Sequence, residues 1–112
     1  MAATHFGLDA ITAFVDVNDL QSDGSTSEIM SFDHAAAWTG FGWDVIEVDG
    51  HSIAALQAAI GAPRSGRPRC ILARTVKGKG ISFMEGVAEW HHGRLTEPQY
   101  AEAQDELEVE RR

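Results

Sequence analysis

The sequence predicts an α/β fold: a partial, doubly wound parallel sheet of about three strands with flanking helices. Three short apolar runs bounded by turn residues are expected to be strands, over residues 11–17, 43–49 and 69–76. Segments with helical spacing follow the first two runs along the chain. Strands that alternate with helices are typical of a parallel sheet built by right-handed crossover connections.

Two helices are expected between the predicted strands. The first covers residues 31–38, with Ser31 as its N-cap and glycines after it. The second begins at the cap residue Ser52 and ends near Gly61, and its apolar residues recur at helical spacing. Helices on both faces would cover a thin three-stranded sheet, as parallel sheets require.

The segments outside these elements are expected to be mostly irregular. Residues 19–27 read as a polar loop, and residues 77–89 show no regular pattern. Thr96, with Gln99 three positions later, resembles a capping box that opens a last helix through Leu107.

The composition excludes several classes of protein. The net charge of −8 and the scattered basic residues argue against nucleic-acid binding, which needs clustered Lys and Arg. No apolar run approaches membrane-spanning length, and the single cysteine, Cys70, excludes an internal disulfide and fits a reducing compartment. We therefore expect a cytoplasmic chain with one partial domain over residues 1–112, and no nucleic-acid or membrane partner.

The end of the first predicted strand is the most informative point of the chain. In residues 14–24 an apolar strand runs into a turn rich in Asn, Asp and Gly, and Asn18 stands where the strand ends. Ligands of open α/β sheets bind at the carboxyl ends of the strands. The amide oxygen of Asn18 is thus well placed for a metal–phosphate group, although Asn also caps turns without binding a ligand.

Four segments of the chain together carry a resemblance to a known protein family. They are residues 8–24, residues 41–51 (Phe-Gly-Trp-Asp-Val-Ile-Glu-Val-Asp-Gly-His), residues 73–85 (Ala-Arg-Thr-Val-Lys-Gly-Lys-Gly-Ile-Ser-Phe-Met-Glu) and residues 89–92 (Glu-Trp-His-His). In this order and spacing they resemble transketolases, in particular the C-terminal half of the amino-terminal subunit of bacterial split transketolases. The Gly-Asp-Gly element, which forms the first half of the family's thiamine-diphosphate motif, is not among these residues.

The resemblance implies half of a thiamine-diphosphate-binding fold with Mg²⁺ or Ca²⁺. It assigns one metal ligand to the Asn18 side chain and one to the backbone carbonyl of Leu20, and both cations prefer such oxygen ligands. Asp19 stands where many relatives have Gly, and Val17 where some have Asn. Asp tolerates a left-handed turn, so the ligand assignment is retained.

The resemblance also implies roles for a histidine and a lysine. A histidine directly after the tryptophan contacts cofactor and ketose donor in the family, which makes His91 the candidate catalytic and cofactor-binding residue. His92 is an adjacent competitor, and a solvated pair of loop histidines is the alternative for both. Lys77, beside flexible glycines, is a candidate for binding the diphosphate or a solvated surface lysine.

The implied reaction is transfer of a two-carbon ketol unit from a ketose phosphate to an aldose phosphate, as in the pentose phosphate pathway. Other transketolase polypeptides are expected to supply the Gly-Asp-Gly segment and the aminopyrimidine-binding domain, so that the chain acts in an oligomer and is inactive alone. Two alternatives remain: a non-catalytic, truncated interaction protein, and a piece of another thiamine-diphosphate enzyme, such as a deoxyxylulose-phosphate synthase or a natural-product ketol transferase. The Trp90-His91 pair favours a transketolase over the synthase.

Overall fold

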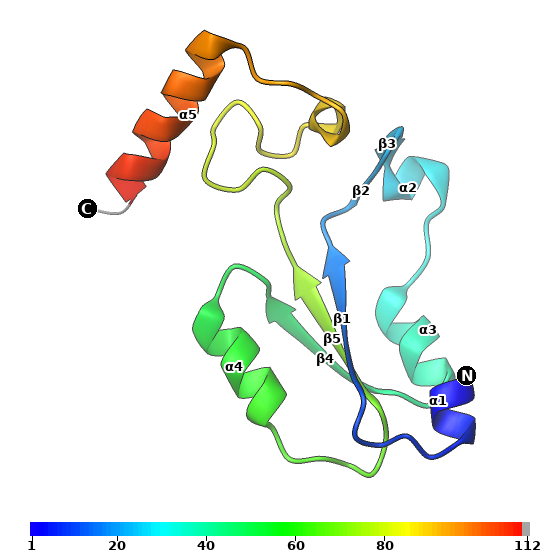
Figure 1. The fold of residues 1–112 in the computed structure, drawn as a ribbon. Helices are drawn as coiled ribbons and strands as arrows, with labels where there is room; N and C mark the ends of the chain where they lie inside the picture. Colours follow the sequence, from blue (N-terminus) through cyan, green and yellow to red (C-terminus); the bar gives the residue numbers. More distant parts are fainter. Residues whose placement is uncertain (111–112) are drawn as a thin grey trace. The chain divides into compact units, whose positions relative to one another are not determined.

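The computed structural model describes residues 1–110 of the chain, in two compact units (Figure 1). The sheet unit comprises Met1–Val17 and Ser31–Thr75, and the loop unit comprises Asn18–Met30 and the chain from Val76 onward. The expected single domain over residues 1–112 stays a prediction, and its last two residues lie outside the described part. No helix among the described residues is long and apolar enough to cross a membrane.

The sheet unit is built around three parallel strands. The central strand β5 pairs with β1 on one side (Thr12 opposite Arg69) and with β4 on the other (Asp44 opposite Arg69). The elements of this unit are α1 (Ala2–His5), β1 (Thr12–Val17), α3 (His34–Gly40), β4 (Asp44–Asp49), α4 (Ile53–Gly61) and β5 (Arg69–Arg74). The predicted α/β fold, a three-stranded parallel sheet with flanking helices, is confirmed.

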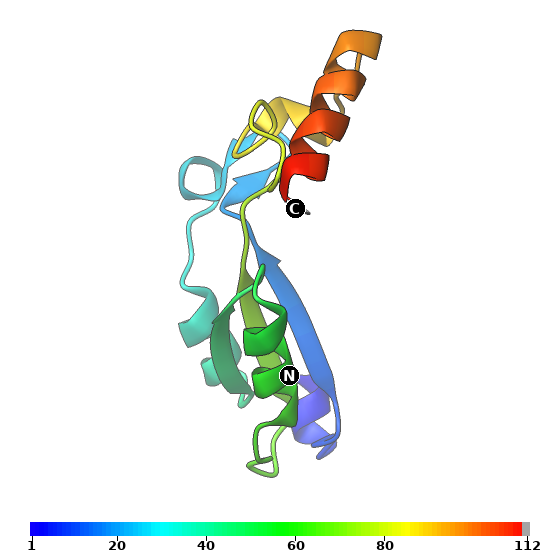
Figure 2. The ribbon, with the colours of Figure 1, turned by 90° about the vertical axis from the view of Figure 1, so that its left-hand side faces the viewer.

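The core of the sheet unit lies on the central strand. Cys70, Ile71 and Leu72 are fully buried, as expected for a parallel strand with neighbours on both sides. Cys70 and Leu72 face the side covered by α3, and α4 packs on β4, so that helices flank the sheet in Figures 1 and 2. Burial raises the pKa of the Cys70 thiol to about 11, so this residue is a neutral core side chain.

Arg69 is the one charged side chain among the buried residues of this core. It is only 1 % exposed, and its guanidinium donates hydrogen bonds to the carbonyls of Ala59 and Ala62 (3.0 and 2.8 Å) and to the Asp44 carboxylate (3.2 Å). The last carbonyls of a helix lack partners within the helix. Arg69 therefore joins the end of α4 to two strands of the sheet.

Two helix starts test the capping predictions. Ser52 accepts a hydrogen bond from the Ala55 amide (3.2 Å) at the start of α4, as predicted. The prediction for the helix over residues 31–38 was wrong at its start, because Asp33 caps α3 through the Ala36 amide (2.9 Å). A cap needs an oxygen three residues before the free amide, and the Asp33 carboxylate supplies it two residues after Ser31.

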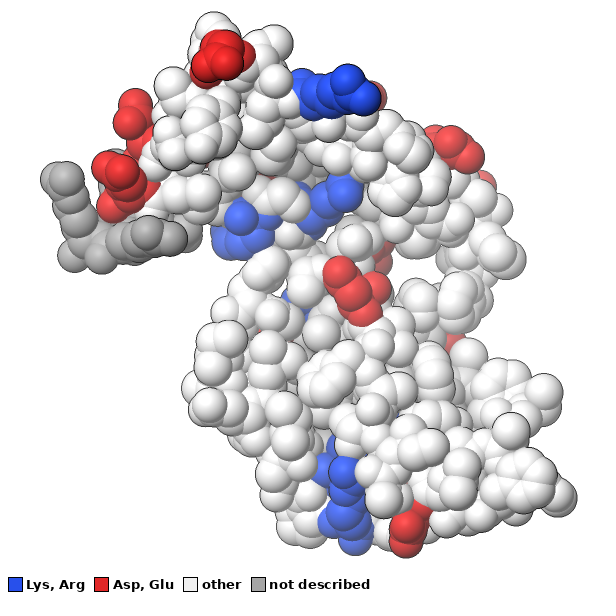
Figure 3. Space-filling view, in the orientation of Figure 1, with Lys and Arg blue, Asp and Glu red and all other residues white. Residues whose placement is uncertain are grey.

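The loop unit contains short elements and one longer helix. They are β2 (Leu20–Gln21), β3 (Gly24–Ser25), α2 (Thr26–Ile29), the 3₁₀ helix η1 (Ala88–His91) and α5 (Glu97–Glu110). The predicted capping box at α5 is confirmed, since Thr96 and Gln99 exchange hydrogen bonds at its start. The lysine and arginine side chains visible in Figure 3 are scattered over that face of the described chain, with no single basic patch.

Candidate functional site

The turn after β1 is held by the Asn18 side chain. Asn18 Oδ1 accepts a hydrogen bond from the Leu20 amide (3.0 Å), which is an Asx turn. Asp19, between them, has a φ of 58°, a left-handed conformation that Asp adopts more readily than most residues. The departure from Gly at this position is thus compatible with the turn.

The segment predicted as a polar loop contains a small hairpin instead. Strands β2 and β3 pair with Gln21 opposite Gly24, so that Ser22 and Asp23 form a two-residue turn. Ser25 then caps α2 through the Glu28 amide (3.3 Å). The prediction missed these elements because each strand has only two residues, too few for a periodic pattern.

The register of this hairpin directs the Leu20 carbonyl outward. The Thr26 amide donates to the Asp19 carbonyl (2.9 Å), and Leu20 lies opposite Ser25 in the next pair along the ladder. Hydrogen-bonded and non-hydrogen-bonded pairs alternate in an antiparallel ladder. The Leu20 carbonyl therefore points away from β3, toward the same edge at which its amide meets Asn18.

The loop that carries Lys77 is closed on itself. The Gly86 amide donates to the Lys77 carbonyl (2.9 Å), and Lys79 pairs with Glu85 (3.1 Å). Gly78 has a φ of 75°, and a Cβ there would lie 2.6 Å from the Met84 carbonyl oxygen. Only glycine fits this close approach, so the backbone at Lys77 has a defined path.

His91 ends the 3₁₀ helix η1, and its neighbour Trp90 fixes that helix. The Trp90 indole donates to the Phe83 carbonyl (3.0 Å), and a Cβ on Gly93 would lie 2.5 Å from the Trp90 ring. His91 Nε2 lies 3.3 Å from Ser22 Oγ, within hydrogen-bond distance. The rings of His91 and His92 are nearly perpendicular, with centroids 4.5 Å apart.

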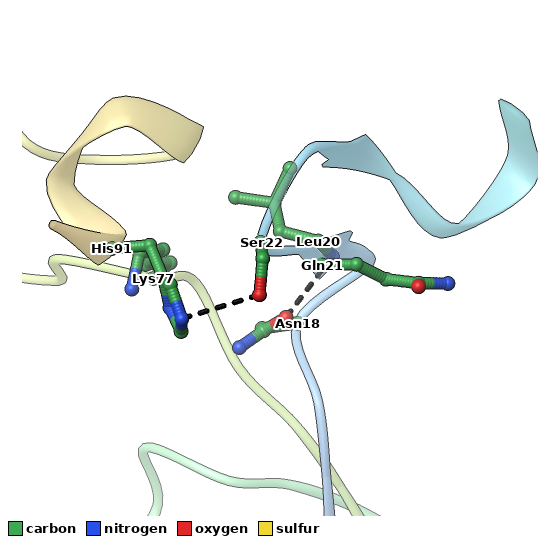
Figure 4. A pocket seen from close by; sticks show the side chains of 6 residues that line it. All are labelled: Asn18, Leu20, Gln21, Ser22, Lys77 and His91. Carbon is green, nitrogen blue, oxygen red and sulfur yellow. Dashed lines mark hydrogen bonds between the residues drawn. The ribbon is translucent and has the colours of Figure 1, made fainter. Parts of the chain in front are cut away.

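These features meet at one pocket of about 270 Å³ in the loop unit (Figure 4). The residues that line it are Asn18, Leu20, Gln21, Ser22, Lys77 and His91. All four residues singled out from the sequence are thus brought together, whereas His92 does not line the pocket. The sequence analysis did not predict Gln21 or Ser22 as site residues. The Ser-Asp-Gly turn signal at residues 22–24 is the one local feature from which a turn beside them could have been predicted.

The pocket presents neutral oxygens together with positively charged or hydrogen-bonding nitrogens. Asn18 and Leu20 offer an amide and a carbonyl oxygen, whereas Lys77 offers an ammonium and His91 an imidazole. No group of three or more His, Cys, Asp or Glu side chains among the described residues is arranged to hold a metal ion. The oxygens suit a cation and the nitrogens suit a phosphate, so the pocket fits a ligand that contains both groups. The phosphate of such a ligand would supply the negative charge that the lining residues lack.

Comparison with known proteins places the chain in a family. The family model described as "Transketolase, thiamine diphosphate binding domain" matches residues 1–112. The chain is 42% identical to one of the subunits of the apulose-4-phosphate transketolase of Phocaeicola vulgatus, over 96% of this chain and 39% of that protein. It is 41% identical to the 6-deoxy-6-sulfo-D-fructose transketolase subunit SqwG of a Clostridium species, over 92% of this chain and 38% of that protein. The chain thus spans about two fifths of the length of these relatives.

Solved structures show the same fold. Transketolase from Campylobacter jejuni superposes with a TM-score of 0.80 at 22% identity, over 96% of this chain and 17% of that one. Transketolase from Pichia stipitis, in complex with sedoheptulose 7-phosphate, gives a TM-score of 0.80 at 25% identity, over 96% and 16% of the two chains.

Proposed function

The chain belongs to the transketolase thiamine-diphosphate-binding domain family, and on this premise we propose that its pocket binds the metal–diphosphate end of thiamine diphosphate. The enzyme of which it is part would transfer a two-carbon ketol unit between sugar phosphates. The observation that carries the proposal is the convergence of Asn18, Leu20, Lys77 and His91 on one pocket. Segments far apart in the sequence supply these four residues, so the local sequence pattern alone does not bring them together.

In this proposal Asn18 and Leu20 are ligands of Mg²⁺ or Ca²⁺. The hydrogen bond from the Leu20 amide uses one lone pair of Asn18 Oδ1 and leaves the second for a cation. The hairpin register, which turns the Leu20 carbonyl toward the same edge, supports this role. Two neutral oxygens of one short turn would occupy neighbouring corners of the coordination sphere, with diphosphate oxygens and water at others.

Lys77 and His91 are proposed to act on the anionic groups. The ammonium of Lys77 would offset diphosphate charge, and the imidazole of His91 would donate hydrogen bonds and move a proton at the transferred ketol unit. The bound cofactor supplies the chemistry that stabilises the carbanion. The chain's own residues would bind and orient it.

We further propose that polypeptide outside residues 1–112 completes the site, in an oligomer. The Gly-Asp-Gly element and the activating glutamate of the family would come from there, since the 112 residues contain no Gly-Asp-Gly. Exposed large apolar side chains in the sheet unit support a covering partner, and they include Phe14 (52 % exposed) and Ile53 (68 % exposed). Turnover of a ketose phosphate by these residues alone, as a monomer with thiamine diphosphate and Mg²⁺, would contradict this.

Asn18→Ala in the complete protein tests the metal assignment. We expect cofactor binding at a fixed Mg²⁺ concentration, measured by calorimetry, to weaken by more than about tenfold. Asn18→Asp keeps an oxygen ligand and should retain most of the affinity. Gln104→Ala, which removes an amide from α5, is the control. If Asn18 only holds the turn, Asn18→Ala will lower stability while the Mg²⁺ dependence of binding stays unchanged.

A further inference from the structure

Ser22 is held at a fixed point of the loop unit. It is the first residue of the two-residue turn that joins β2 to β3, and the ladder pairs on each side of the turn define its position. Its side chain is directed toward the pocket, whereas the neighbouring Gln21 side chain points away from His91 (Figure 4). A hydroxyl on such a turn can donate or accept a hydrogen bond with little loss of rotational freedom.

His91 is held from its own side of the pocket. Trp90 anchors η1 through its hydrogen bond to the Phe83 carbonyl, and the backbone of η1 sets the position of the His91 Cα atom. This anchor leaves the imidazole free to rotate about its side-chain torsions. The contact that restricts it is the one between His91 Nε2 and Ser22 Oγ, at 3.3 Å across 69 residues of sequence.

We propose that Ser22 is a positioning residue, whose hydroxyl fixes the ring orientation of His91. A hydroxyl can donate to an unprotonated imidazole nitrogen or accept from a protonated one, so Ser22 can pair with Nε2 in either tautomer. The contact holds Nε2 at Ser22 and thereby sets the direction of Nδ1 as well. The edge-to-face contact with His92 supports the same ring orientation.

The catalytic consequence of this pairing rests on the proposed function. If His91 moves a proton at the ketol unit, its ring must stand in one orientation at each turnover. Loss of one neutral hydrogen bond corresponds to about a fivefold change in an equilibrium constant. We therefore expect Ser22→Ala to lower kcat by about fivefold while cofactor affinity changes by less than about twofold. Ser22→Thr, which keeps the hydroxyl, should restore kcat.

NMR measurement of the three-bond couplings that report the His91 side-chain torsions, in the complete protein without cofactor, tests the pairing independently of activity. We expect His91 to show the couplings of one dominant rotamer, whereas exposed His92 shows couplings averaged over several rotamers. Ser22→Ala should bring the His91 couplings to the same averaged values. Ser27→Ala, which removes a serine hydroxyl from the same segment without lining the pocket, should leave them unchanged.

The outcomes separate this proposal from the proposed function. Averaged couplings at His91 in the unsubstituted protein overturn the pairing, and this outcome is decisive even if Ser22→Ala fails to fold. Weaker cofactor binding in Ser22→Ala with unchanged His91 couplings would make Ser22 a cofactor contact and would also overturn it. A fixed His91 rotamer that Ser22→Ala releases, in a protein without ketol transfer, supports the pairing and contradicts the proposed function.

Discussion

The sheet unit and the loop unit hold their residues in place by different means. The sheet unit buries apolar side chains around β5, in which Ile71 and Leu72 are inaccessible to solvent. Among the described side chains of the loop unit, only Ala103 is an apolar residue buried to a similar degree. Hydrogen bonds, tight turns and glycine conformations order the loop unit instead, as at Gly78 and Trp90.

The comparison shows why the candidate site consists of turns. Polar groups that bind a ligand must remain accessible, so they cannot be fixed by burial in an apolar core. Each hydrogen bond that fixes them contributes about 1 kcal/mol, whereas a buried core side chain contributes about 1.5–3 kcal/mol. We therefore expect substitutions in the sheet unit to affect stability, and substitutions around the pocket to affect function.

The largest effect is expected for Arg69→Met in the sheet unit. Removal of the guanidinium leaves the Ala59 and Ala62 carbonyls without this donor and the Asp44 carboxylate without its ion-pair partner. We expect the free energy of unfolding of the complete protein, measured by urea titration, to fall by about 3 kcal/mol. Arg67→Met, at an exposed position, is the control and should stay within about 0.5 kcal/mol. Equally small changes in the free energy of unfolding for both variants would contradict a role of Arg69 in stabilising the core.

In the loop unit, His91→Ala should lower activity strongly and change stability little, the reverse of Arg69→Met. We expect turnover of the complete enzyme at saturating cofactor to fall by about a hundredfold, because one general acid–base group is lost. The free energy of unfolding should change by less than about 0.5 kcal/mol, since the side chain is exposed. His92→Ala, outside the pocket, should lower turnover much less. Equal, small losses of turnover in both variants would instead support the alternative that His91 and His92 are a solvated pair of loop histidines.

The smallest effect is a local pH dependence at α5. The Glu106 carboxylate accepts hydrogen bonds from the Ser82 hydroxyl (2.5 Å) and the Ser82 amide (2.6 Å), and these lower the pKa of Glu106 below its ordinary value of 4.5. A lowered pKa in the folded state means that the contact stabilises above pH 4.5 and is lost as the pH falls through the folded value. Because Glu106 is partly exposed to solvent, only the Ser82 contact should respond.

The Ser82 amide proton reports this contact by NMR. Near pH 7 we expect Glu106→Gln to shift the Ser82 amide signal, and Glu108→Gln, at another acidic position of α5, to leave it in place. Below the folded pKa the unsubstituted protein and Glu106→Gln should give the same signal. A Ser82 amide signal that changes neither with pH nor in Glu106→Gln would contradict the contact between Ser82 and Glu106.

Much of the sheet unit could be predicted from the sequence. Apolar runs and cap residues such as Ser52 are local signals, and they indicated the three strands and the start of α4. The order β1-β5-β4 and the burial of Arg69 could not be predicted, because both depend on contacts between segments far apart in the chain. The Ser31 cap failed for a local reason, since the carboxylate of Asp33 is the better cap for the same helix.

The candidate site was predicted less completely. Asn18, Leu20, Lys77 and His91 came from a family resemblance, and a pocket lined by all four agrees with it without establishing their roles. The pairing of Ser22 with His91 joins residues 69 positions apart. No periodicity or short motif encodes such a contact, so it required the structure.

The central claim is that Asn18 and Leu20 hold the cation of a metal–diphosphate group. Its most direct test is a crystal structure of the complete protein with thiamine diphosphate and Mn²⁺, with the ion located by its anomalous signal. We predict an ion about 2.1 Å from both Asn18 Oδ1 and the Leu20 carbonyl oxygen, bridged to diphosphate oxygens. An ion with neither oxygen within about 3 Å would contradict the claim.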